Sequence, residues 1–93
     1  MKKKLLAISK SLGGEVVQIL DDKCQIENVV INETKWLIKE KKENMWEAKI
    51  DGFPKIVLST RSLLKLLETE MRIIETKNII VLSSPKKQQE NTP

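Results

Sequence analysis

Acid–base chemistry in this chain would have to come from carboxylates, lysines or a single thiol, because the sequence contains no histidine and no tyrosine. The thirteen Asp and Glu residues fall in expected turns and on expected solvent faces, without the clustering of a metal site. No glycine-rich loop followed by Lys and Ser or Thr is present to hold a phosphate. We therefore expect a non-enzymatic protein with no metal and no cofactor.

Cys24 is the only cysteine of the chain. A reactive thiol needs a nearby group that favours the thiolate, and histidine, the usual one, is absent. We interpret Cys24 as a buried structural residue beside a strand.

The net positive charge of the chain comes from its two ends. Seventeen Lys and Arg against thirteen Asp and Glu give a formal net charge of +4 over 93 residues. Residues 1–14 contain four lysines and no acid, whereas residues 15–84 contain eleven basic and twelve acidic residues. The body of the protein is therefore nearly neutral, and a nucleic-acid surface has to be argued from local clusters rather than from net charge.

A lysine-rich segment over residues 34–58 is the main candidate surface. Cations that follow phosphates, with aromatic rings that stack on bases, are typical of sheets that bind single strands. Trp36 and Trp46 lie on the apolar face of the predicted hairpin, so we interpret them as core, and acidic neighbours dilute the positive charge. The candidate residues for binding nucleic acid or a partner are Lys2, Lys3, Lys4, Lys35, Lys39, Lys41, Lys42, Lys49, Phe53 and Lys55.

The three N-terminal lysines have several interpretations. They could bind nucleic-acid phosphates or an acidic protein surface, and they could equally serve solubility alone. We favour solubility, because a short basic start is common.

The alternation of apolar and polar residues predicts an antiparallel sheet. Residues 34–40 and 45–50 form the clearest hairpin, with Ile38 and Trp46 on the apolar face and lysines and glutamates on the other. Residues 15–20, 24–31 and 55–58 are predicted as further strands. In residues 24–31, alternation places Ile26 and Val30 on one face and Val29 and Ile31 on the other.

Helices are expected at two places. Residues 3–12 favour a short helix, with a strand as the alternative, and Ser59 or Thr60 begins an amphipathic helix with a leucine stripe. Residues 72–76 are either a continuation of that helix or a strand, and residues 79–83 are predicted as a strand.

These elements predict an α+β fold, in which a small antiparallel meander of four to five strands packs against one amphipathic helix. Residues 1–83 are expected to form one domain, and residues 84–93 a flexible, disordered polar tail.

Residues 55–59 (Lys-Ile-Val-Leu-Ser), followed by a helix with Leu63 and Leu67, resemble the end of the positive cofactor 4 type of single-strand-binding domain. The resemblance covers about fifteen residues and implies a sheet that binds single strands. Residues 51–55 (Asp-Gly-Phe-Pro-Lys) depart from the Pro-Gly-Lys-Lys-Gly run of that family, and a strand after the helix would be foreign to it. We do not assign the chain to the family on this basis.

We expect a small cytoplasmic accessory protein, because residues 5–8 are too short an apolar stretch for a signal peptide and no window approaches ~18 apolar residues. Its expected partner is a larger nucleoprotein assembly, RNA or single-stranded DNA, with no membrane contact. The alternative is a protein–protein interaction module, such as an inhibitor or assembly factor of a phage or mobile element. The sequence leaves a homodimer open.

Overall fold

The computed structural model describes the backbone of residues 1–19 and 21–90 and the side chains of residues 1–19 and 21–78. Its elements follow one another along the chain as α1 (Lys2–Ser11), β1 (Glu15–Gln18), β2 (Cys24–Ile31), β3 (Thr34–Lys42), β4 (Met45–Ile50), β5 (Ile56–Leu58) and α2 (Thr60–Glu90). The predicted helix near the N-terminus is confirmed as α1.

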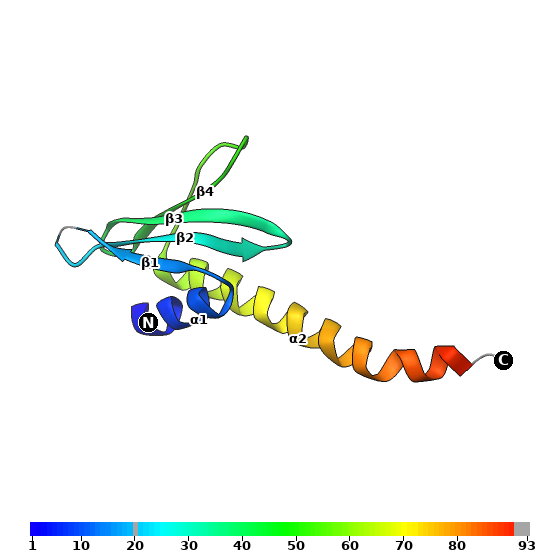
Figure 1. The fold of residues 1–93 in the computed structure, drawn as a ribbon. Coiled ribbons are helices and arrows are strands. Elements are labelled where there is room, and N and C mark those ends of the chain that lie inside the picture. Colours follow the sequence, from blue (N-terminus) through cyan, green and yellow to red (C-terminus); the bar gives the residue numbers. More distant parts are fainter. Residues whose placement is uncertain (20, 91–93) are drawn as a thin grey trace.

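The five strands form one antiparallel sheet in the order β1-β2-β3-β4-β5, so the predicted meander is confirmed. Both helices lie on the same side of this sheet (Figure 1). The protein is therefore a two-layer α+β fold, with helices covering one face of the sheet and no described element covering the other.

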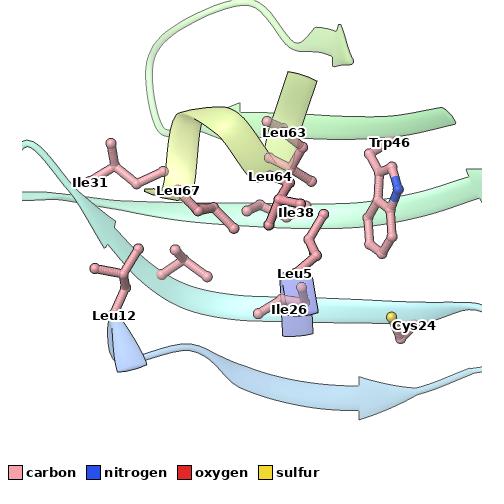
Figure 2. Close-up of a cluster of buried hydrophobic side chains, with 12 residues drawn as sticks. Leu5, Leu12, Cys24, Ile26, Ile31, Ile38, Trp46, Leu63, Leu64 and Leu67 are labelled. Atoms are coloured by element: carbon pink, nitrogen blue, oxygen red, sulfur yellow. The ribbon is translucent and has the colours of Figure 1, made fainter. Parts of the chain in front are cut away.

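The core lies between the sheet and the two helices. Leu5 of α1, Ile26 and Ile38 of the sheet, and Leu63 and Leu67 of α2 have no exposed surface. Figure 2 shows these side chains converging from the three sides. An aliphatic core of this kind is stabilised by about 1.5–3 kcal/mol for each large side chain that is fully buried.

Trp46 joins this core to the start of α2. Its ring is fully buried, as predicted, and its Nε1–H donates to Thr60 Oγ1 at 3.0 Å. The Thr60 amide donates to Asn44 Oδ1 at 3.0 Å, and the Ser62 amide donates to Ser59 Oγ at 3.1 Å. Ser59 thus caps α2 at the predicted place, and the turn between β3 and β4 fixes where the helix begins.

For the second half of β2, the predicted assignment of side chains to the two faces of the sheet is wrong. Ile26, Val29 and Ile31 are all buried on the helix side, although strict alternation places Val29 and Ile31 opposite Ile26. The register shifts between Ile26 and Val29, and Asn28 has a φ of 63°. A β-bulge at Asn28 adds one residue and reverses the facing of the later residues of the strand, and asparagine tolerates the left-handed conformation that this requires.

The connection from α1 to β1 fits against this bulge. The Val30 amide donates to the Leu12 carbonyl at the end of α1, at 3.0 Å. A Cβ at Gly14 would lie 2.7 Å from the Ser9 carbonyl oxygen and 2.8 Å from methyl groups of Ile26 and Val29. Only glycine allows the backbone to pass this close.

The predicted strand over residues 79–83, and the alternative strand over residues 72–76, are wrong. The backbone of α2 stays helical to Glu90, and its C-terminal part extends past the sheet (Figure 1). Met71 and Ile74 continue the helical spacing of the leucine stripe and pack against the core, so the helical period persists beyond residue 70. The short apolar run at residues 79–82 has no periodicity that separates a strand from a helix.

The flexibility of residues 84–93 stays a prediction: the backbone to Glu90 continues α2, and residues 91–93 lie outside the described residues. Over the described part of the chain, none of the helices has the length and apolar character needed to cross a membrane.

We predict that Gly14→Ala lowers the free energy of unfolding by about 1–3 kcal/mol, because the added methyl group meets a carbonyl oxygen and two packed side chains. Urea unfolding followed by tryptophan fluorescence measures this change. Gly52→Ala measures backbone strain alone, because Gly52 has a positive φ and no atom lies within 4 Å of its Cβ position. A Gly14→Ala variant as stable as the wild type would show that the close approach at Gly14 does not limit stability.

Candidate binding surface on the open face of the sheet

The face of the sheet that the helices leave uncovered carries four of the nine predicted lysines, which are Lys35, Lys39, Lys49 and Lys55. Because Ile38 and Ala48 point into the core, their neighbours Leu37, Lys39 and Lys49 point to the opposite side. Leu37 lies opposite Lys49 in the β3–β4 ladder, and Lys39 lies opposite Glu47. The structure therefore brings together Lys35, Lys39 and Lys49 from two adjacent strands.

Two shallow hollows on this face lie side by side and share Leu37 and Lys49 in their linings, and we call the two together the open-face groove. The larger hollow, of about 410 Å³, is lined by Gln25, Glu27, Asn28, Lys35, Trp36, Leu37, Lys49 and Asp51. The smaller hollow, of about 220 Å³, is lined by Leu37, Lys39, Glu47, Lys49 and Lys55. Four of the ten predicted site residues thus lie along one groove.

The lysines of the groove differ in their pairing. Lys55 Nζ lies 3.7 Å from Glu47 Oε1, so part of its charge is neutralised locally. Lys35, Lys39 and Lys49 take part in no ion pair with any side chain that the structure describes. These three ammonium groups are available to an anionic ligand.

Other predicted site residues lie away from the groove floor. Lys41 lines a separate hollow of about 290 Å³ next to Lys39, and Lys42 is exposed where β3 ends. Phe53 lies in the loop between β4 and β5 and is 65% exposed, as expected of an aromatic residue in that turn. These three residues line neither hollow of the groove.

The N-terminal lysines lie on α1, on the helix side of the sheet, and two of them are paired. Lys2 Nζ lies 2.9 Å from Glu40 Oε1 and donates to the Asp22 carbonyl at 2.7 Å. Lys4 Nζ lies 3.1 Å from Glu68 Oε2 of α2. The structure does not bring Lys2, Lys3 and Lys4 together with the groove, and the ion pairs of Lys2 and Lys4 attach α1 to the sheet and to α2.

Glu40, which pairs with Lys2 of α1, also contacts Cys24 at the start of β2. The Cys24 amide donates to Glu40 Oε1 at 3.1 Å, and its Sγ lies 3.8 Å from the same oxygen. Cys24 is fully buried, as predicted, and burial raises the pKa of its thiol. A thiol that is held protonated in the core fits the structural interpretation.

Trp36 is half-buried and packs against the core, as the sequence predicts. Its Nε1–H is buried and has no hydrogen-bond partner among the described residues. Because the ring is engaged with the core, Trp36 offers no free face on which a base could stack.

Sequence reasoning missed Gln25, Glu27 and Asn28, which line the groove beside the lysines. Alternation in β2 was the available signal for Gln25 and Glu27, since it places them on the side opposite Ile26. No pattern in the sequence indicated the bulge that places Asn28 in the lining of the groove.

Over the part of the chain whose side chains are described, no group of three or more Cys, Asp and Glu residues is arranged to hold a metal ion. Comparisons with protein-family models, with curated proteins and with solved structures found no match to this chain.

We predict that the contribution of the Lys2–Glu40 pair to the free energy of unfolding is lost at alkaline pH. The hydrogen bond to Glu40 raises the pKa of Lys2 above its ordinary value of 10.5, so the pair contributes fully below that pH. Its contribution is lost as pH rises through the raised pKa of the folded state, because the lysine then loses its proton.

The measurement is urea unfolding of the wild type and of Lys2→Met over about pH 9 to pH 11.5. Because the Lys2 side chain is 39% exposed, we expect the two proteins to differ by less than about 1 kcal/mol at pH 9 and to converge at the alkaline end. A constant difference across the range would contradict the role of the pair.

Proposed function

We propose that the protein is a non-enzymatic accessory protein that binds single-stranded nucleic acid in the open-face groove, alone or within a larger nucleoprotein assembly. The observation that carries this proposal is the set of lysines without ion-pair partners among the described side chains, Lys35, Lys39 and Lys49, along a groove on the uncovered face of the sheet.

The spacing of these lysines favours an extended anion over a compact one. Lys35 and Lys39 are four residues apart on β3, which corresponds to ~13 Å along an extended strand. Lys49 lies opposite Leu37, between them in the ladder and about 5 Å to the side. A small anion reaches one or two of these ammonium groups, whereas successive phosphates of a strand reach all of them.

The apolar groups along the groove favour a single strand over a duplex. Leu37 lies at the centre of the groove, and the exposed ring of Phe53 lies in the loop that precedes β5. Only an unpaired strand presents base faces to such groups, since a duplex shows the protein its phosphates and base edges.

A second candidate function is docking to a protein through β5. This three-residue edge strand leaves Ile56 42% exposed and Val57 58% exposed, next to Phe53. An exposed apolar edge can accept a strand from a partner. A pull-down from the native host with and without nuclease separates the two candidates, because a partner held through nucleic acid is lost after digestion and a direct protein partner is retained.

We predict a measurable, salt-dependent affinity for single-stranded oligonucleotides in fluorescence anisotropy titrations at ~50 mM salt. Three phosphate contacts on a single strand give a slope of about −2 for the logarithm of the association constant against the logarithm of salt concentration. The affinity therefore falls roughly 20-fold between 50 mM and 200 mM salt.

Lys39→Ala and Lys49→Ala should each weaken binding and reduce the magnitude of that slope by about 0.7, because each removes one phosphate contact. Lys65→Ala is the matched control, since Lys65 is an exposed lysine of α2 that lies away from the open face. Absence of binding at ~50 mM salt, or an equal loss in the control, would contradict the proposed function.

A further inference from the structure

We propose that the larger hollow of the open-face groove, beside the β2 bulge, is a subsite for one nucleobase that carries an exocyclic amino group. This inference rests on the proposed function and adds base selectivity to it. Cytosine, adenine and guanine would be accepted there in preference to thymine and uracil.

The hollow has the size and the composition of a ligand subsite. The hollow is shallow and open to solvent, and its volume of about 410 Å³ leaves room for a nucleobase. Leu37 supplies apolar surface, and Gln25, Glu27, Asn28 and Asp51 supply polar groups around it. The flanking Lys35 and Lys49 can hold the phosphates on either side of a bound nucleotide.

The polar groups of the hollow are rich in hydrogen-bond acceptors. Gln25 Nε2 donates to Glu27 Oε2 at 2.7 Å, and Asn28 Nδ2 donates to Glu15 Oε1 at 3.4 Å. An ionised carboxylate only accepts, so each bond uses one of the two N–H groups of an amide nitrogen and leaves the amide oxygen as an acceptor. Asp51 is exposed in the turn after β4 and adds a further carboxylate.

The presence of carboxylates in a groove for an anionic strand needs an explanation. Glu27 and Asp51 take part in no ion pair among the described side chains, so they repel phosphates and offset part of the attraction that Lys35 and Lys49 exert. A base amino group removes that conflict, because it donates to a carboxylate or an amide oxygen; an acidic side chain accepting from the cytosine amino group is a common pairing. Thymine and uracil have no amino group: they present two carbonyl oxygens and one ring N3–H, so they offer fewer donors to these acceptors.

The test compares ten-nucleotide oligomers of deoxycytidine and of deoxythymidine, which have similar size and the same backbone charge, by fluorescence anisotropy at ~50 mM salt. We expect the wild type to bind the deoxycytidine oligomer about 5- to 100-fold more tightly. The double variant Glu27→Gln with Asp51→Asn should reduce this ratio to less than about twofold without weakening binding of the deoxythymidine oligomer.

Two further variants keep the test interpretable. Lys39 lies outside the larger hollow, so Lys39→Ala should weaken binding of both oligomers and leave the ratio of the two affinities unchanged. Asp51→Asn alone changes only an exposed turn residue, so it is expected to fold and to lose part of the preference. Circular dichroism checks the folding of each variant.

Equal binding of the two oligomers by the wild type, or a preference that survives in the double variant, would overturn the base subsite and leave the proposed function in place. Failure of the wild type to bind either oligomer would overturn the proposed function, and the subsite with it.

Discussion

The bulge at Asn28 is the constraint on which the arrangement of this protein depends. Because it reverses the facing of β2, Ile26, Val29 and Ile31 all point towards the helices, and the second half of the strand adds to the core rather than to the opposite face. The same bulge receives the end of α1 through the Val30 amide and the close approach at Gly14. One face of the sheet thus becomes apolar and covered, which leaves the other face polar and open.

This division gives the lysines of the chain different roles. Lys2 and Lys4 hold α1 against the sheet and α2 through ion pairs, so two of the four lysines in residues 1–14 are used within the fold. Lys35, Lys39 and Lys49 lie on the open face without such pairs among the described side chains. The positive charge on the open face therefore comes from the nearly neutral body rather than from the basic N-terminus, and net charge is a poor guide to the binding surface.

Local sequence patterns predicted those parts of the fold in which apolar and polar residues alternate regularly. The hairpin of residues 34–50 alternates cleanly, and this alternation placed Ile38 and Trp46 in the core and Lys35, Lys39 and Lys49 on one outer face. The bulge could not be predicted, because the only residue that sets it apart is an asparagine with a positive φ. The end of α2 could not be predicted, because consecutive apolar residues fit a strand and a helix equally well. The pairing of Lys2 with Glu40 joins residues 38 positions apart in the sequence, and no local pattern reports such a contact.

The most direct test of this account is an NMR titration of the ¹⁵N-labelled protein with a single-stranded oligonucleotide at low salt. The account predicts that amide shifts change along β3 and β4, around Lys35, Leu37 and Lys49, while the amides of α1 around Lys2 and Lys4 remain unchanged. Shift changes confined to α1, or to the edge strand β5, would show that the open face of the sheet is not the binding surface.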